Sequence, residues 1–293
     1  MSRSLAPKLT MAPVIALVLI VFVGGLLWTV AVSFTASKSV PDWEFVGMAN
    51  WMKLFGNARW IISYKNMLVF GIVYIGGCLF LGYILAILID ERVRFESLFR
   101  TVFLFPHALS FIVTGSVWQW YLNPQLGLQK FVQDLGWTGF EFSIIASRSF
   151  ALYAVILAAI WHGTGIVMVL LLAGLRGVDE DIWKATRVDG IPRWRTYLSV
   201  VLPMLGPSVA TSVVLLGAGV VKNYDLVIAM TGGGPGTATE VPAKFVMENL
   251  FERSNIGLAA SGATMMLITV VCIAAPYLYW QSWQRRRGKG VDA

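Results

Sequence analysis

The chain has 293 residues, of which 57% are hydrophobic and only 13% are charged. An ordinary soluble domain has about 25% charged residues, so this composition excludes one. The 23 basic and 16 acidic residues leave a net charge of +7, but they form no basic water-facing patch of the kind that binds nucleic acid, which is therefore not expected as a partner.

Long stretches without Asp, Glu, Lys or Arg follow one another along the chain. Six of them exceed the ~18 residues that mark a membrane-spanning helix. They are residues 9–37, 66–89, 101–129, 149–175, 196–221 and 254–284. A helix satisfies its backbone hydrogen bonds internally, as the bilayer interior requires. The sequence therefore predicts an all-α polytopic protein with six transmembrane helices, surrounded by membrane lipid.

The first stretch follows Arg3 and Lys8, a basic start that a cleaved signal peptide would also have. Its apolar run from Pro13 to Phe34 is much longer than the core of a signal peptide, which has about 7–15 residues, and no A-x-A site closes it. We expect a retained helix. The chain then has three predicted parts. Residues 1–65 contain the N-terminal tail, this helix and the first outer loop. Residues 66–284 form a core with five helices, and residues 285–293 form a basic tail.

The basic residues between the spans predict the orientation in the membrane. With the N-terminus inside, the inner segments hold 14 of the 23 Lys and Arg residues, whereas the acidic residues divide equally between the two sides. Excess Lys and Arg mark cytoplasmic loops. The sequence thus predicts cytoplasmic termini and an inner-membrane location.

Residues 176–199, here called the coupling segment, form a long and patterned inner loop. Asp179 is a plausible N-cap, with Glu180 and Asp181 in the first helical turn, where carboxylates favour the helix dipole. Gly190 then fits the C′ position, and Pro192 the first position of the next helix. Taken alone, this pattern fits a connecting hairpin and a docking helix about equally well.

Three regions of the chain carry a family resemblance. Residues 183–191, W-K-A-T-R-V-D-G-I, followed by L-P-M-L-G-P at 202–207, resemble the "E-A-A…D-G…L-P…P" signature of permease subunits of binding-protein-dependent ABC importers. Residues 100–127 are similar to another conserved region of that family. The third region is residues 225–236, which end in T-G-G-G-P-G, with its continuation to 251. It resembles the carbohydrate-uptake branch of the family, which contains the maltose-type permeases, and it looks closest to the hexose-type permeases of that branch.

The resemblance implies a type I importer permease fold and a set of partners. These are a cytoplasmic ATPase dimer, a periplasmic sugar-binding protein and a second permease chain, which in carbohydrate systems is usually a different one. It also implies that the coupling segment contacts the ATPase through Trp183, Ala185, Thr186, Val188, Asp189 and Gly190. The chain departs from the signature at Lys184, where the family usually has Glu.

The Gly-rich stretch at 232–236 could suggest a phosphate-binding loop. A Walker motif needs Lys-Ser/Thr at its end and a following helix, and this stretch has no such ending. We expect a structural turn instead. ATP hydrolysis is therefore expected on a separate subunit, so that this chain is not an enzyme and needs no cofactor or metal.

The two histidines, His107 and His162, both fall inside uncharged spans. A polar ring there needs a partner or a water-filled cavity, so the alternatives are a substrate site and a structural hydrogen bond between helices. Pro106 is expected to distort the helix beside His107. Matching the maltose-type permeases motif by motif implies that the sugar is contacted by His107, Phe111, Trp161, His162, Gly163, Gly217, Gly219 and Asn223.

The glycines of this set would leave room for a sugar, and the aromatic rings would cover its apolar faces. We therefore expect the permease of an importer for a monosaccharide or small glycoside. The alternative is an ion-coupled secondary transporter, which usually has intramembrane carboxylates; the six spans contain none. Cys78 and Cys272 lie inside spans and are expected to pack as small apolar residues.

Overall fold

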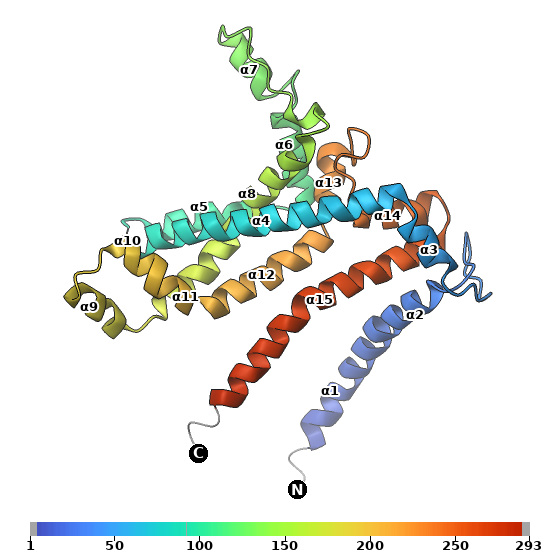
Figure 1. Cartoon of the computed structure of the whole chain (residues 1–293), viewed down its shortest axis with the longest axis horizontal. Helices are drawn as coiled ribbons and strands as arrows, with labels where there is room; N and C mark the ends of the chain where they lie inside the picture. Colours follow the sequence, from blue (N-terminus) through green and yellow to red (C-terminus); the bar gives the residue numbers. More distant parts are fainter. Residues whose placement is uncertain (1–4, 92, 289–293) are drawn as a thin grey trace. The chain divides into compact units, whose positions relative to one another are not determined.

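The computed structural model describes residues 5–91 and 93–288, and side chains for residues 11–91 and 93–275. Arg3 and residues 289–293 of the predicted basic tail lie outside the described part. The chain begins with α1 (Leu5–Val18), a π-helical turn η1 (Leu19–Val23) and α2 (Gly24–Val32) (Figure 1). These three elements are continuous, and together they cover most of the first predicted span, up to Val32.

Four helical stretches of the described chain are long and apolar enough to cross a membrane by themselves. They are Met11–Val32, α4 (Ala58–Asp90), α8 (Ala151–Arg176) and Ile256–Ala275 within α15 (Ile256–Gly288). Many of their large apolar side chains are exposed, above all between Val14 and Leu27. Such a surface is stable in lipid and not in water.

The other two predicted spans are bent pairs of helices. α5 (Glu96–Ala108) and α6 (Phe111–Tyr121) meet at 96°, a turn that Figure 1 shows clearly. The second pair consists of the stretch Arg193–Met204 and α12 (Gly206–Val221), which meet at 70°. The stretch contains α10 (Arg193–Arg195), the π-helical η3 (Thr196–Val201) and α11 (Leu202–Met204). Six spans result if each bent pair counts as one.

Prolines and a helix cap lie close to the two breaks. Pro106 lies inside α5, which continues through it and ends two residues later at Ala108; since a proline disturbs the turn that precedes it, it does not by itself place the break. Ser110 caps α6 and accepts a hydrogen bond from the backbone N–H of Val113 at 3.3 Å. Pro207 stands in the first turn of α12, where a proline lacks no helical hydrogen bond.

Shorter elements connect these helices. They are α3 (Ala49–Phe55), α7 (Leu128–Asp134), the 3₁₀ turn η2 (Ile144–Ala146), α9 (Glu180–Val188), α13 (Tyr224–Thr231), α14 (Pro242–Met247) and the π-helical η4 (Glu248–Glu252). Gly232, Gly233 and Gly236 have positive φ. The hydroxyl of Thr239 binds the carbonyl oxygen of Gly234 at 2.9 Å, so the Gly-rich stretch is a closed turn, as predicted.

The described chain divides into two compact units. The first contains the residues up to Ile61 together with Pro242–Thr269, and the second contains Ile62–Val241 with the residues from Val270 onward. The first break lies close to the predicted boundary at residue 65. The return of Pro242–Thr269 to the N-terminal unit has no counterpart in the sequence pattern.

Buried polar contacts hold the first unit together. The side-chain amide of Asn50 donates to the carbonyl oxygens of Ser33 at 3.1 Å and Thr35 at 2.8 Å, and the hydroxyl of Ser261 donates to the same Ser33 carbonyl oxygen at 3.2 Å. A Cβ atom at Gly257 would stand 2.8 Å from the Thr35 oxygen. Glycine is therefore required where α15 begins.

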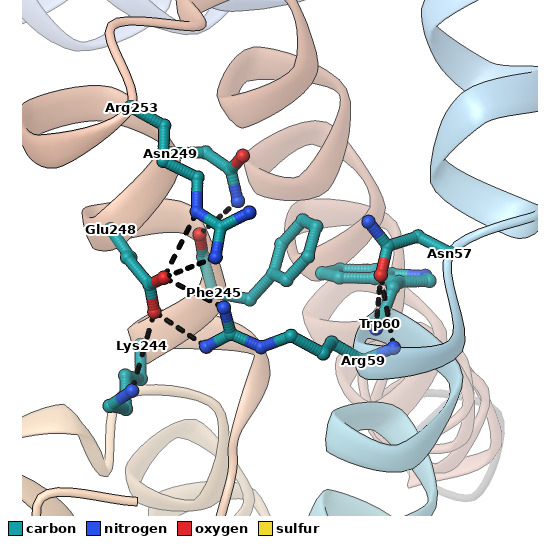
Figure 2. A network of polar contacts seen from close by, with 8 residues as sticks. All are labelled: Asn57, Arg59, Trp60, Lys244, Phe245, Glu248, Asn249 and Arg253. Atoms are coloured by element: carbon teal, nitrogen blue, oxygen red, sulfur yellow. Dashed lines mark hydrogen bonds and ion pairs between the residues drawn. The ribbon is translucent and has the colours of Figure 1, made fainter. Parts of the chain in front are cut away.

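The carboxylate of Glu248 organises a further polar cluster in this unit (Figure 2). It accepts two hydrogen bonds from the guanidinium of Arg59, at 2.7 and 2.5 Å, and others from Arg253 at 2.8 and 3.0 Å. Lys244 lies 3.4 Å away. These bonds lower the pKa of Glu248 to about 2, and those from Arg59 have the largest effect. Trp60 packs beside the cluster on Phe245, with 5.3 Å between ring centroids.

Close helix contacts build the second unit. α6 packs along α13, and α5 packs along α8. A Cβ atom at Gly115 on α6 would lie 2.5 Å from the Cβ of Ala229 on α13, and one at Gly165 on α8 would lie 2.0 Å from the carbonyl oxygen of Phe103 on α5. Small residues allow such close approach of membrane helices. These contacts position the candidate site.

Candidate translocation and coupling sites

The break between α5 and α6 brings His107, Phe111 and His162 together. The ring of His162 on α8 lies 5.0 Å from the ring of His107 and 4.3 Å from that of Phe111, measured between centroids. The Phe111 and His162 rings are stacked, with 29° between their planes. We call these three residues the histidine cluster.

A backbone carbonyl at the break orients the His162 ring. The N–H of Val113 binds the Ser110 hydroxyl rather than the carbonyl oxygen of Leu109, so that oxygen has no helical donor. The Nε2 atom of His162 lies 3.1 Å from it. A carbonyl only accepts, so Nε2 carries the proton, and the neutral ring presents Nδ1 as an acceptor.

Several buried polar atoms of the second unit have no partner among the described residues. The Nδ1 atom of His162, the hydroxyl of Thr114 and both amide atoms of Asn223 have none, although all three side chains are buried. They belong to α8, to α6 and to the residue that precedes α13, three elements that contact one another. Buried groups of this kind cost free energy unless something binds them.

Thr114 was not predicted as a site residue. Single threonines are common in membrane helices, where the hydroxyl binds the backbone carbonyl one turn earlier. The sequence therefore offers no signal that the Thr114 hydroxyl makes no such bond.

The other predicted substrate residues lie in different surroundings. Trp161 meets Trp118 edge-on at 6.0 Å and lines an apolar hollow of about 350 Å³. The predicted room beside Gly163 is absent, because a Cβ there would stand 2.6 Å from the Tyr74 hydroxyl oxygen. A Cβ atom at Gly217 would stand 3.1 Å from the Ile273 side chain, and of the three glycines only Gly219 faces open space.

The sugar contacts that the resemblance implies for His107, His162 and Asn223 stay a prediction. The apolar hollow beside Trp161 is not lined by His107, His162 or Asn223. A second and larger hollow, which lies beside α9 (Glu180–Val188), is not lined by them either.

The coupling segment forms the predicted short helix and turn. The Asp179 carboxylate caps α9 by accepting from the N–H of Asp181 at 3.0 Å. Gly190 has φ +68°, and the backbone N–H groups of Gly190 and Ile191 bind the carbonyls of Arg187 and Thr186 at 3.2 and 3.0 Å. This is a Schellman C-cap, which favours glycine at C′. The next helix starts at Arg193, one residue later than predicted.

The predicted coupling residues divide between two faces of α9. Trp183 packs edge-on against Tyr197 at 5.2 Å, and Thr186 is buried. Ala185, Val188, Asp189 and Gly190 are exposed. Trp183 and Thr186 therefore anchor the helix to the chain, and the exposed residues form the face that a partner could reach.

A hollow of about 830 Å³ lies behind the inner face of α9. Charged side chains line it, among them Asp90, Glu96 and Arg176. Arg176 lies 2.8 Å from Glu96 and 3.8 Å from Asp90, measured between nitrogen and oxygen atoms. Sequence reasoning did not pair these residues, because they are 80 or more positions apart.

Solved structures share this fold. A bacterial ABC transporter involved in the import of the acidic polysaccharide alginate has a chain that matches with a TM-score of 0.80, at 17% identity, over 97% of this chain and 96% of that one. At that identity the likeness concerns the fold. It supports the predicted type I importer permease architecture.

Sequence relatives identify the family. A probable ABC transporter permease protein of Pyrococcus horikoshii is 33% identical over 274 residues, 93% of this chain and 94% of the relative. A xylose/arabinose import permease protein of Haloferax volcanii is 34% identical over 262 residues, 88% of this chain and 82% of the relative. Residues 78–289 match the family described as the inner membrane component of binding-protein-dependent transport systems. The ion-coupled alternative is therefore wrong, and the chain belongs to this family as a multi-pass permease subunit that is not itself an enzyme.

Proposed function

We propose that the chain forms one half of the translocation pathway of an ATP-driven importer for a monosaccharide or small glycoside. A periplasmic binding protein delivers the sugar, and a cytoplasmic ATPase dimer drives its passage. Both termini and the coupling segment then face the cytoplasm. The unequal distribution of Lys and Arg between the loops supports this orientation.

The histidine cluster carries the assignment of the sugar site. His162 offers an unpartnered acceptor at Nδ1, and Asn223 offers an unpartnered donor and acceptor. Sugar hydroxyls both donate and accept, so they satisfy all three atoms. One face of Phe111 is stacked on His162, so its opposite face is the one that would pack on the apolar face of a pyranose ring.

The substrate is expected to be neutral and small. Phe111, His162 and Asn223 include no permanently charged side chain, and a buried anion needs a paired cation. The xylose/arabinose relative and a trehalose/maltose permease of Thermococcus litoralis, 24% identical over 277 residues, are named for small neutral sugars. Contrasting cases are the alginate importer and two permeases of Agrobacterium fabrum that are named for sulfoquinovosyl glycerol and sn-glycerol-3-phosphate, 27% and 26% identical.

A second permease chain is part of the proposal. An ATPase dimer presents two docking grooves, whereas this chain supplies one exposed α9 helix. Carbohydrate systems usually combine two different permeases. We therefore expect a heterodimer in which this chain contributes half of the pathway.

Affinity purification from the native membrane tests the proposal. The tagged chain should bring down an ATPase, a second permease and a binding protein. Calorimetry on that binding protein, with xylose, glucose, maltose and an alginate oligosaccharide, should detect tight binding of a neutral sugar. Binding of only the alginate oligosaccharide would overturn the neutral assignment, and a complex without any ATPase would overturn the importer assignment.

A further inference from the structure

Arg176 joins the ends of three helices of the second unit. It is the last residue of α8, and its guanidinium lies 2.8 Å from Glu96, the first residue of α5, and 3.8 Å from Asp90, the last residue of α4. A carboxylate at a helix N-terminus and a guanidinium at a helix C-terminus both favour the helix dipoles. The ion pair thus closes one end of the α5–α8 contact.

The same two helices are fixed to each other at two further levels. At Gly165, α8 approaches the Phe103 carbonyl so closely that a Cβ would stand 2.0 Å from its oxygen. At the far end, His162 binds the carbonyl of Leu109, where α5 ends. The three contacts lie along the whole length of α5, so α5 and α8 have little freedom to slide past each other.

The position of Arg176 in the chain connects this pair to α9. Only Gly177, Val178 and Asp179 separate Arg176 from the first residue of α9. On its other side α9 is held by the packing of Trp183 on Tyr197. A displacement of α9 therefore acts first on the end of α8 that Arg176 ties to α5.

We propose that Arg176 is a positioning residue that makes α5, α8 and α9 move as one body. Through it, movement of α9 reaches the break at Leu109 and hence the ring of His162. The physical basis is rigid-body movement of packed helices, one of the ways in which distant sites of a protein are coupled. This proposal rests on the proposed function in one respect: the ATPase must dock on α9 and move it.

A neighbouring ion pair supplies a matched control. Arg193 lies 2.7 Å from Glu91, and their side chains are 77% and 41% exposed. Arg176 is 42% exposed, and its partners Glu96 and Asp90 are 28% and 20% exposed, so this group is the less exposed of the two. Exposed pairs contribute little, because water and salt screen them. Loss of the Arg193 pair should therefore leave the motion unchanged.

The direct test measures a distance within the complete transporter. Spin labels go on Glu180→Cys in α9 and Val102→Cys in α5, both at exposed positions, in a chain that also has Cys272→Ser. The distance is compared without nucleotide and after trapping with ATP and vanadate. With Arg176 intact, the distance distribution should stay the same in both states. With Arg176→Gln, trapping should shift or broaden it, while Arg176→Lys and Arg193→Gln should behave as the parent does.

A second readout separates positioning from simple destabilisation. Stimulation of ATPase activity by the binding protein should fall about fivefold or more in Arg176→Gln, while basal activity and assembly persist. If that variant fails to assemble, Glu96→Gln removes the same pair from the other helix. A distance that changes on trapping in the parent overturns the proposal, and so does one that stays constant in assembled Arg176→Gln or Glu96→Gln. A parent complex with no response to any sugar-loaded binding protein would count against the importer assignment, while the distances would still decide the role of Arg176.

Discussion

The Nε2 atom of His162 lies 3.1 Å from the carbonyl oxygen of Leu109, at the point where α5 ends and the chain turns into α6. This bond serves two purposes at once. It satisfies a carbonyl that the break removes from the helical pattern, and it leaves Nδ1 as a buried acceptor without a partner. A structural role and a substrate role are therefore not exclusive for this residue.

The first prediction separates these two roles. His162→Leu removes the bond to the Leu109 carbonyl and the Nδ1 acceptor, whereas His162→Gln keeps an amide that can donate to that carbonyl. One lost hydrogen bond contributes ~0.5–1.5 kcal/mol, so transport per assembled complex should drop several-fold in the leucine variant while basal ATPase activity survives. Sugar uptake into proteoliposomes, normalised to assembled complex, measures this. A complex that falls apart but transports normally per surviving molecule would leave only the structural role.

The second prediction concerns the turn after α9. Gly190 has φ +68° and open space where a Cβ atom would stand, so a side chain there costs backbone strain, ~1 kcal/mol or more, rather than a clash. Gly190→Val should weaken ATPase binding, because the Schellman turn fixes the direction of α9. Asn tolerates positive φ better than other residues, so Gly190→Asn should retain most of the binding. A pull-down with the ATPase subunit compares the two, and equal binding would contradict a docking role for this turn.

The third prediction concerns the departure from the family signature. The Lys184 ammonium lies 2.9 Å from Asp181 and 3.9 Å from Glu180, both on its own helix. Its charge is therefore largely satisfied within α9, and docking should depend on the shape and apolar contacts of the exposed face. Lys184→Ala and Lys184→Glu should each keep ATPase affinity within about threefold, since repulsion between like charges on a helix costs only a few tenths of a kcal/mol. Loss of binding in both variants would show that the groove requires a positive charge, and loss in the glutamate variant alone would show that it rejects a negative one.

The fourth prediction follows from the lowered pKa of Glu248. A carboxylate with a pKa of about 2 in the folded chain, against an ordinary value of 4.5, stabilises the fold above pH 4.5. That contribution is lost as the pH falls through the folded pKa. The shift corresponds to roughly 3 kcal/mol as an upper value, reduced by the exposure of Arg253. Thermal unfolding in detergent should therefore show that Glu248→Gln is less stable than the parent at pH 7, and that the difference shrinks towards pH 2. A constant difference would contradict this account.

Charge-free stretches predicted most of the fold. They predicted six spans because the energetic cost of a charge in lipid leaves a direct mark on the sequence. Pro106 predicted a distorted helix, but the position and angle of the bend depend on which neighbours occupy the break, such as His162 beside Leu109. The Schellman turn at Gly190 was predictable because its requirements are local.

Contacts between distant residues were not predictable in the same way. Arg59 and Glu248 are 189 positions apart, and a single sequence contains no signal that pairs them. Gly163 was expected to leave room for substrate, yet the Tyr74 side chain fills that room. A glycine in a membrane helix serves close packing as readily as an open cavity, and only the neighbouring helix decides between them.

ATP-driven uptake tests the central claim most directly. The purified complex of this chain with its ATPase, second permease and binding protein is placed in proteoliposomes, with ATP in the lumen on the cytoplasmic side of the transporter, and radiolabelled neutral sugar and binding protein outside. The account predicts accumulation of sugar against its gradient that requires both ATP and binding protein and is reduced by His162→Leu. Accumulation driven by a proton or sodium gradient without ATP would contradict it.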